Sequence, residues 1–379
     1  MLIDQERLAR TFIQLCETDS PSREEGRMAV LVTEMLCSVG APLPFEDDSA
    51  SKTGSQCGNL IFRFDNGTTT QEPLFLCCHL DTVEPGRGIK VLRQGNRFTS
   101  KGDTILGSDD KAAIAALIEA WRVIQENKLA YVPLEFIFTT CEEIGLLGAK
   151  ALNPHQIRAQ MGYALDSSGF GRVLIGAPAS NRFRITVTGI AAHAGLHPEK
   201  GISAIRLAAQ ALAAAPCGRI DRETTVNFGT IQGGTATNIV PEQVLIEGEV
   251  RSHSPAKLER LTKEIETAFR SVLSAWCDPS GQAQGVPELT FQVELDFPQM
   301  QLNREDAVIR RLTEAAARIG LPLSYEIAGG GSDANIFNGC GLPTAIVATG
   351  MTNVHSTAEE VSLEDMTQLT QLVLALITA

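Results

Sequence analysis

The stretch Leu74-Phe75-Leu76-Cys77-Cys78-His79-Leu80-Asp81 decides the fold. Its first five residues form an uninterrupted apolar run, which predicts a strand buried on both faces, as in the centre of a parallel sheet. His79 and Asp81 follow where this strand ends. Because sites in open α/β sheets lie outside the carboxyl ends of the strands, the segment predicts both an α/β fold and a functional site at one sheet edge.

The same arrangement recurs along the chain. Three more apolar runs predict buried strands, at residues 134–139, 162–165 and 344–348. Side chains that can bind metal follow them: Glu142 and Glu143, Asp166, and His355. A single histidine after a strand usually has a structural role, but repetition of this placement at four strands favours a functional site.

Together with Asp109, these carboxylates and imidazoles suit two divalent metal ions. Without cations, carboxylates held so close together would repel, and some would stay protonated at neutral pH. The spacing of His79 and Asp81 predicts that the histidine binds metal through one ring nitrogen while the aspartate accepts a hydrogen bond from the other. In the Glu142-Glu143 pair, one carboxylate can bind metal while the other takes a proton from metal-bound water; a solvated pair at a helix start is the alternative.

The order of predicted elements changes in the middle of the chain. Residues 180–293 read strand, helix, strand, strand, helix, strand, the βαββαβ order of a ferredoxin-like unit that can fold alone. Ser254 as N-cap and Pro255 at the first helical position begin its second helix. The simplest architecture is an α/β domain made of residues 1–176 and 294–379, with a ferredoxin-like α+β domain inserted at 177–293. Near the N-terminus, Ser22 followed by Glu25 predicts a capping box.

Composition narrows the function further. A chain of 379 residues, 44% hydrophobic and 20% charged, suits a soluble protein with two cores. The formal charge of −13 argues against nucleic acid and anionic membranes as partners. No apolar run reaches the ~18 residues of a membrane span, and no signal-peptide pattern opens the chain. The nine cysteines, without CxxC spacing, predict reduced core thiols in the cytoplasm; a cysteine zinc site is the alternative, which the opposite orientations of neighbouring Cys77 and Cys78 disfavour.

These motifs, taken in order, resemble the M20 family of metallopeptidases, and most closely its peptidase T-like branch. The segments that carry the resemblance are HLDTV at 79–83, GSDDKAA at 107–113, TCEEIG at 140–145, ALD at 164–166, GIAAHAG at 189–195 and NVHS at 353–356. The resemblance covers nearly the whole chain. It implies a zinc-exopeptidase-like catalytic domain with a mixed central sheet, and an inserted domain that serves as a lid and for dimerisation.

The resemblance also implies a role for each site residue. The ligands of two zinc ions would be Asp109 between them, His79 and Asp166 on one ion, and Glu143 and His355 on the other. Glu142 would be the general base, Asp81 would orient His79, and the peptide bond after Asp109 would be cis. Three ligand carboxylates and a bridging hydroxide would balance the charge of two divalent ions, and the same ligands also accept Co²⁺ or Mn²⁺.

Substrate contacts are implied in the same way. His193, in the inserted domain, would reach the active site of the partner subunit in a homodimer and stabilise the oxyanion; an exposed sheet edge also favours dimerisation. Positions that contact substrate in the family match Asn238, Arg251, Ser332 and Asp333. The alternatives are a turn residue for Asn238 and a surface charge for Arg251. Residues 329–333 lack the lysine and spacing of a phosphate-binding loop.

The sequence therefore predicts a cytoplasmic di-zinc aminopeptidase, tripeptidase-like, that hydrolyses small peptides with metal-bound hydroxide as nucleophile. An amidohydrolase of N-acyl or N-carbamoyl amino acids on the same fold is the alternative, and the metal ligands cannot separate the two reactions. A third hypothesis is a metal-binding protein that has lost catalysis. Against it, every candidate catalytic position is filled.

Overall fold

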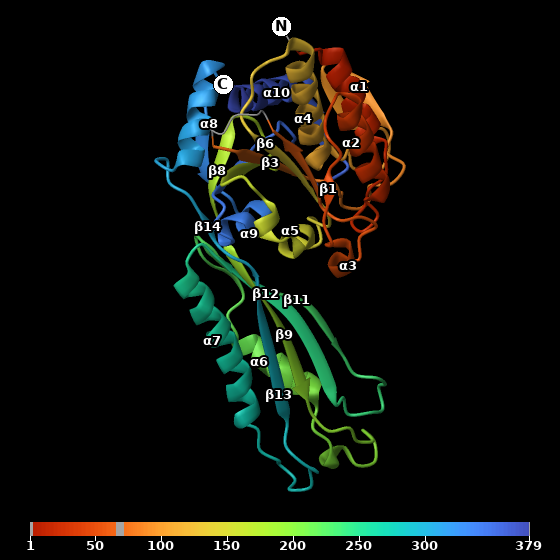
Figure 1. The fold of residues 1–379 in the computed structure, drawn as a ribbon. Coiled ribbons are helices and arrows are strands. Elements are labelled where there is room, and N and C mark those ends of the chain that lie inside the picture. Colours follow the sequence, from red (N-terminus) through yellow and green to blue (C-terminus); the bar gives the residue numbers. More distant parts are fainter. Residues whose placement is uncertain (1–2, 66–71, 379) are drawn as a thin grey trace. The chain divides into compact units, whose positions relative to one another are not determined.

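The computed structural model describes residues 3–65 and 72–378. The chain divides into two compact units (Figure 1): Met1–Gly176 with Met300–Ala379, here called the discontinuous unit, and Ala177–Gln299, the inserted unit. The inserted unit ends about six residues later than residue 293, where the sequence placed the boundary. The reason is that its last strand, β13 (Glu288–Phe297), stays paired with the first strand of the unit as far as Phe297.

A mixed sheet of nine strands forms the centre of the discontinuous unit. Its strands in spatial order are β1 (Phe45–Glu46), β2 (Leu60–Phe64), β6 (Leu134–Thr139), β3 (Leu74–His79), β7 (Met161–Ala164), β16 (Thr344–Val347), β8 (Arg172–Ala177) and β14 (Met300–Gln301), with β15 (Ser324–Ile327) paired to β8. The four strands β6, β3, β7 and β16 run parallel to one another, while β2 and β8 flank them antiparallel. The α/β class with a mixed sheet, expected from the sequence, is confirmed.

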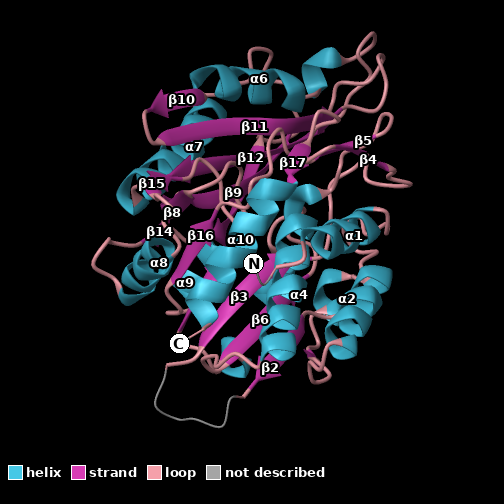
Figure 2. Ribbon diagram, turned by 90° about the horizontal axis from the view of Figure 1, so that it is seen from above, coloured by secondary structure: helices cyan, strands magenta, loops and turns pink. Residues whose placement is uncertain are grey.

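Helices cover both faces of this sheet, which explains why its strands are apolar without alternation. On one face, the ring of Phe75 in β3 lies 5.0 Å from Phe337 of α9 (Asp333–Gly339). On the other, Phe64 of β2 lies 4.1 Å from Trp121 of α4 (Ser108–Asn127). Figure 1 shows α4 and α9 on opposite sides of the sheet, and in Figure 2 α4 lies across β3 and β6.

The remaining elements of this unit complete its layers. Its other helices are α1 (Gln5–Cys16), α2 (Gly26–Ser38), α3 (Ala50–Thr53), α5 (Leu147–Ala151), α8 (Ala307–Arg318) and α10 (Leu363–Ile377). A small sheet is formed by β17 (Glu360–Ser362), β5 (Arg97–Ser100) and β4 (Val91–Gln94). The capping box predicted at Ser22 and Glu25 is wrong: neither side chain caps α2, because both bind segments distant in sequence.

The inserted unit has the predicted ferredoxin-like order. Its elements are β9 (Ala179–Thr188), α6 (Ala204–Ala214), β10 (Gly218–Asp221), β11 (Thr224–Gly233), β12 (Gln243–Ser252), α7 (Pro255–Ser274) and β13. The sheet is antiparallel in the order β10-β11-β12-β9-β13, and only the short β10 was not expected. Ser254 caps α7 by accepting a hydrogen bond from the N–H of Lys257, as predicted. Apolar side chains of α6 and α7 pack with one face of the sheet into a single core.

Two expectations from the sequence, one on membrane spans and one on cysteines, can be compared with this fold. Within the described ranges, no helix is long and apolar enough to cross a membrane. All nine cysteines are free thiols, and five of them are buried. The expectation of core thiols is wrong for Cys217, Cys277 and Cys340, which are exposed because they lie in connecting segments after helices α6, α7 and α9.

Candidate active site

The candidate site lies at the carboxyl edge of the four parallel strands. His79 is the last residue of β3, and Glu142 and Glu143 follow β6, its neighbour in the sheet. Asp166 follows β7 and His355 follows β16 in a longer loop. Because these strands are adjacent and parallel, side chains from four distant parts of the chain meet at one edge.

Asp109 lies at the centre of the cluster. Its Oδ1 is 3.1 Å from Nε2 of His79, and its Oδ2 is 3.2 Å from Nε2 of His355. Asp109 opens α4 with an extended backbone (φ −82°, ψ 103°), and the Asp109–Asp110 peptide bond is cis, as the resemblance implies. The two oxygens of one carboxylate therefore face two different imidazoles.

The remaining candidate ligands surround this centre. Both carboxylate oxygens of Glu143 lie 3.0 Å from Nε2 of His355, and Oδ1 of Asp166 lies 4.0 Å from Nε2 of His79. One ligand atom each from His79, Asp109 and Glu143 lie within 4.8 Å of one another, close enough to share a metal ion. The donor set of two imidazoles and three carboxylates fits divalent ions such as Zn²⁺.

The pKa values of the clustered side chains are shifted by burial and by their neighbours. Burial raises the pKa of Asp166 well above its usual value, and the negative charge of Asp109 raises it further. Burial raises the pKa of Glu142 in the same way, with the charge of Asp166 adding to the effect. Hydrogen bonds to Asp109 and Glu143 raise the pKa of His355 to about 10. Bound metal ions would favour the ionised forms of Asp166 and Glu142 and the neutral form of His355.

Asp81 lies beside His79, and its main chain makes the shorter contact with the ring. Nδ1 of His79 is 2.9 Å from the backbone oxygen of Asp81 but 3.6 Å from its carboxylate, which is too long for a hydrogen bond. The carboxylate is taken up instead by the N–H groups of Glu142 (2.9 Å) and Glu143 (3.2 Å) and by the hydroxyl of Ser22 (2.6 Å). The main chain of Asp81 thus contacts His79, its side chain contacts the Glu142–Glu143 turn, and its role in orienting His79 stays a prediction.

Sequence reasoning missed the residues that support this turn. Glu25 is fully buried, and its Oε1 accepts hydrogen bonds from the N–H of Cys141 (2.9 Å) and of Arg23 (2.9 Å). Its other oxygen accepts the hydroxyl hydrogen of Ser55 (2.5 Å). Cys141 has a φ of +54°, so the turn between β6 and the two glutamates is left-handed at this point. The only local signal was the Ser22–Glu25 pair, which has the same spacing as a capping box.

Ser332 and Asp333 lie at the start of α9, and both are buried. The Ser332 hydroxyl caps the helix by accepting a hydrogen bond from the N–H of Ala334, in a capping box with Asn335. Asp333 accepts a hydrogen bond from the hydroxyl of Thr139, at the end of β6, at 2.5 Å. Burial raises the pKa of Asp333 to about 6. Both side chains are thus engaged within the protein, and a contact with substrate stays a prediction.

In the inserted unit, the structure brings together two of the three predicted residues. His193 pairs with Ile239 in an isolated β-bridge, and the N–H of Ala194 donates to the backbone oxygen of Asn238 at 2.9 Å. Both His193 and Asn238 have exposed side chains. Their loops lie beyond the end of the sheet where Gln243 of β12 pairs with Thr188.

Arg251 lies at the opposite end of the same sheet. It stands eight residues beyond Gln243 on β12, a separation of roughly 26 Å at ~3.3 Å per residue. Its guanidinium is already paired with Glu249, with Nε 2.9 Å from Oε1. Within this unit, Arg251 therefore belongs to a different locality from His193 and Asn238.

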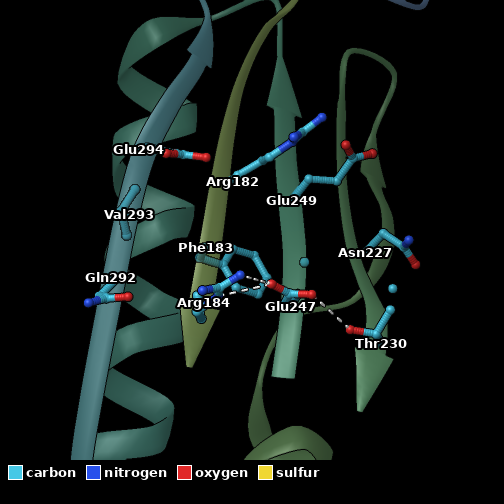
Figure 3. Close-up of a pocket in the computed structure, with 12 residues that line it drawn as sticks. Arg182, Phe183, Arg184, Asn227, Thr230, Glu247, Glu249, Gln292, Val293 and Glu294 are labelled. Carbon is cyan, nitrogen blue, oxygen red and sulfur yellow. Dashed lines mark hydrogen bonds and ion pairs between the residues drawn. The ribbon is translucent and has the colours of Figure 1, made fainter. Parts of the chain in front are cut away.

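The open face of the inserted sheet, opposite α6 and α7, carries a shallow hollow of about 750 Å³ (Figure 3). Charged side chains across it pair with one another, as Arg184 of β9 does with Glu247 of β12 at 2.6 Å. Of the twelve described residues that line it, none is a predicted site residue.

Comparisons with known proteins agree with this arrangement. Three family models match separate segments: "Peptidase dimerisation domain" at residues 175–277, "Peptidase family M28" at 59–192 and "M42 glutamyl aminopeptidase" at 293–372. The uncharacterised protein YqjE of Bacillus subtilis is 38% identical over 99% of each chain. The crystal structure of the aminopeptidase PepT from Bacillus cereus is 38% identical, with a TM-score of 0.87, over 100% of this chain and 99% of that one. A tripeptidase structure from Staphylococcus aureus is 33% identical, with a TM-score of 0.88, over 100% of this chain and 98% of that one.

Likeness of this extent, over the full length of each relative, places the protein among the metallopeptidases. More narrowly, the chain belongs to the M20 family, in its peptidase T-like branch. The family resemblance that the sequence motifs indicated is thus confirmed.

Proposed function

We propose that this protein is an aminopeptidase of the tripeptidase type, which hydrolyses small peptides with two Zn²⁺ ions. The observation that carries the proposal is the position of the Asp109 carboxylate, with one oxygen facing His79 and the other facing His355. A carboxylate in this position suits a bridge between two ions. The names of the similar structures, an aminopeptidase and a tripeptidase, support the substrate class.

The ligands in this proposal are those predicted from the sequence. His79 and Asp166 would hold one ion, Glu143 and His355 the other, and Asp109 both. Ions bound there would lower the pKa of a water molecule toward ~7 and polarise the carbonyl of the scissile bond. Co²⁺ and Mn²⁺ also suit this ligand set.

Glu142 is proposed as the general base and acid. Its N–H is held by Asp81 while its carboxylate is not needed as a ligand, so it can take a proton from the attacking water and pass it to the leaving amine. Burial, which raises the pKa of Glu142, favours the form that can return the proton. Asp81 acts as the positioning residue of this turn.

His193 is proposed to stabilise the oxyanion in the partner subunit of a homodimer. The match to a peptidase dimerisation model at residues 175–277 and the edge strand β13, with mostly exposed residues, support dimerisation. If light scattering finds only monomer and this monomer is fully active, the cross-subunit role fails. Asn238 and Arg251 stay predicted substrate contacts, and the free thiols support a cytoplasmic location.

Substrate choice can be tested with matched compounds. Metal-free protein reconstituted with Zn²⁺, Co²⁺ or Mn²⁺ is assayed on di- and tripeptides with free or acylated N-termini, and on N-acyl and N-carbamoyl amino acids. We expect turnover of tripeptides with a free N-terminus, and loss of turnover with a chelator. Turnover of acylated substrates alone would favour the amidohydrolase, and tight metal binding without turnover of any substrate would favour the non-catalytic protein.

A further inference from the structure

The carboxylate of Glu359 accepts hydrogen bonds from the main chain around Asp109. It is almost completely buried, at 1% exposure. Its Oε2 accepts hydrogen bonds from the N–H groups of Leu106 (2.8 Å) and Gly107 (2.8 Å). Its Oε1 accepts hydrogen bonds from the Ser108 hydroxyl (2.6 Å) and from the N–H of Asp109 (3.1 Å). Four donors fill the acceptor capacity of one carboxylate.

These donors come from the turn that carries the central carboxylate of the site. Gly107 has a φ of +74°, in the left-handed region, and the backbone of Asp109 is still extended before α4 becomes helical. Three N–H groups of this turn donate to Glu359 instead of to a carbonyl oxygen of a helix, so no helical hydrogen bond fixes their position. The position of the Asp109 carboxylate therefore depends on an acceptor outside the turn.

Glu359 and His355 belong to one closed loop. The N–H of Thr352 donates to the backbone oxygen of Glu360 (2.9 Å), and the N–H of Glu360 donates back to that of Thr352 (3.1 Å). Just beyond, β17 pairs with β5 and anchors the loop to the small sheet. This loop thus holds Asp109 twice, its main chain through Glu359 and its carboxylate through His355 at 3.2 Å.

We propose that Glu359 is a positioning residue of the metal centre, one that sets the Asp109 carboxylate between its two imidazole neighbours. The inference rests on the proposed function in that it assumes metal ions bind at Asp109. Outer partners that orient metal ligands typically contribute 10- to 100-fold to metal affinity or activity. A purely structural role would alter the stability of the metal-free protein and leave metal affinity unchanged.

The substitution Glu359→Gln tests this directly. Gln has nearly the same shape, but its NH₂ group replaces one acceptor oxygen. This NH₂ group would then face the N–H and hydroxyl donors of the turn. Glu360→Gln is the matched control, because the adjacent Glu360 is partly exposed and pairs with Arg97 outside the site. Zinc affinity of each metal-free protein is measured by competition with a chromogenic chelator, beside kcat and KM on a tripeptide.

We expect Glu359→Gln to weaken zinc binding about 10- to 100-fold and to lower kcat, with KM nearly unchanged, while Glu360→Gln behaves as wild type. Zinc affinity of Glu359→Gln equal to that of the control would overturn the proposal. Should Glu359→Gln not fold, Ser108→Ala removes one donor and keeps the carboxylate; unchanged zinc affinity in that variant overturns the proposal equally. If wild type binds zinc but cleaves no peptide, the proposed function fails while zinc affinity still decides the role of Glu359.

Discussion

Replacing Asp81 with Asn tests whether its side chain holds the catalytic turn. The carboxylate accepts three hydrogen bonds, from the N–H groups of Glu142 and Glu143 and from the Ser22 hydroxyl. Burial alone would raise the pKa of Asp81, but the neighbouring His79 and Ser22 lower it below its usual value, so the group is a charged acceptor. Asn keeps one acceptor oxygen and presents an NH₂ group to the remaining donors.

The expected loss follows from counting these donors. The Ser22 hydroxyl can rotate and accept from the new amide, but one of the two N–H groups loses its acceptor whichever way the amide turns. An unsatisfied buried donor costs about 1–3 kcal/mol. If the whole cost falls on the transition state, kcat decreases by roughly 5- to 150-fold, at about 1.36 kcal/mol per factor of ten.

The assay compares Asp81→Asn, Ser22→Ala and wild type, each loaded with metal, by kcat and KM on a tripeptide and by metal content. We expect the Asn variant to lose kcat within this range at full metal loading. Ser22→Ala, which leaves both N–H bonds intact, should lose less. A normal kcat in loaded Asp81→Asn, together with weakened zinc binding, would refute the reasoning, because the side chain would then act on His79 rather than on the turn.

Three other perturbations address separate parts of the site. Glu142→Gln should lower turnover about 10²- to 10⁴-fold with metal content unchanged; near-normal turnover would exclude Glu142 as the base. His193→Ala should lower kcat by up to about 10²- to 10³-fold and spare zinc affinity, and an unaltered kcat would remove it from the mechanism. Zinc affinity should increase as pH rises toward about 10, because His355, whose pKa is raised to about 10, must lose its proton to bind metal. In the metal-free protein, the stabilisation from protonated His355 is complete below about pH 6.5 and is lost as pH rises through about 10. Chelator competition across pH, and unfolding of wild type against His355→Asn, measure both trends; flat profiles would contradict them.

The parallel core of the fold could be predicted because its strands are uninterrupted apolar runs. The segment around Leu74 and the run at 134–139 could be identified as strands without tertiary information, because a strand buried on both faces is apolar throughout in any parallel sheet. Adjacency of the four strands then brought His79, Glu143 and Asp166 to one edge. The short antiparallel strands, such as β1 with two residues, carry too few residues to show a pattern.

The supporting carboxylates could not be predicted in this way. The Ser22 hydroxyl contacts a residue 59 positions away, and Glu25 contacts Cys141 over 116 positions. Glu359 binds the turn before α4 across about 250 positions. A local pattern contains no information about partners at such distances, and at Ser22 and Glu25 it indicated a helix cap instead. Similarly, the separation of Arg251 from His193 follows from strand register, which residue type does not reveal.

The loop that carries His355 and Glu359 has a consequence for the order in which the enzyme becomes competent during synthesis. Four of the five proposed ligands precede the inserted unit in the chain, whereas this loop follows it. A growing chain on the ribosome can therefore complete and fold the inserted unit before Glu359 and His355 are available to contact Asp109. The proposed metal centre therefore cannot be complete before the chain beyond Glu359 has been synthesised, so a nascent chain that ends within the inserted unit lacks one of the five proposed ligands.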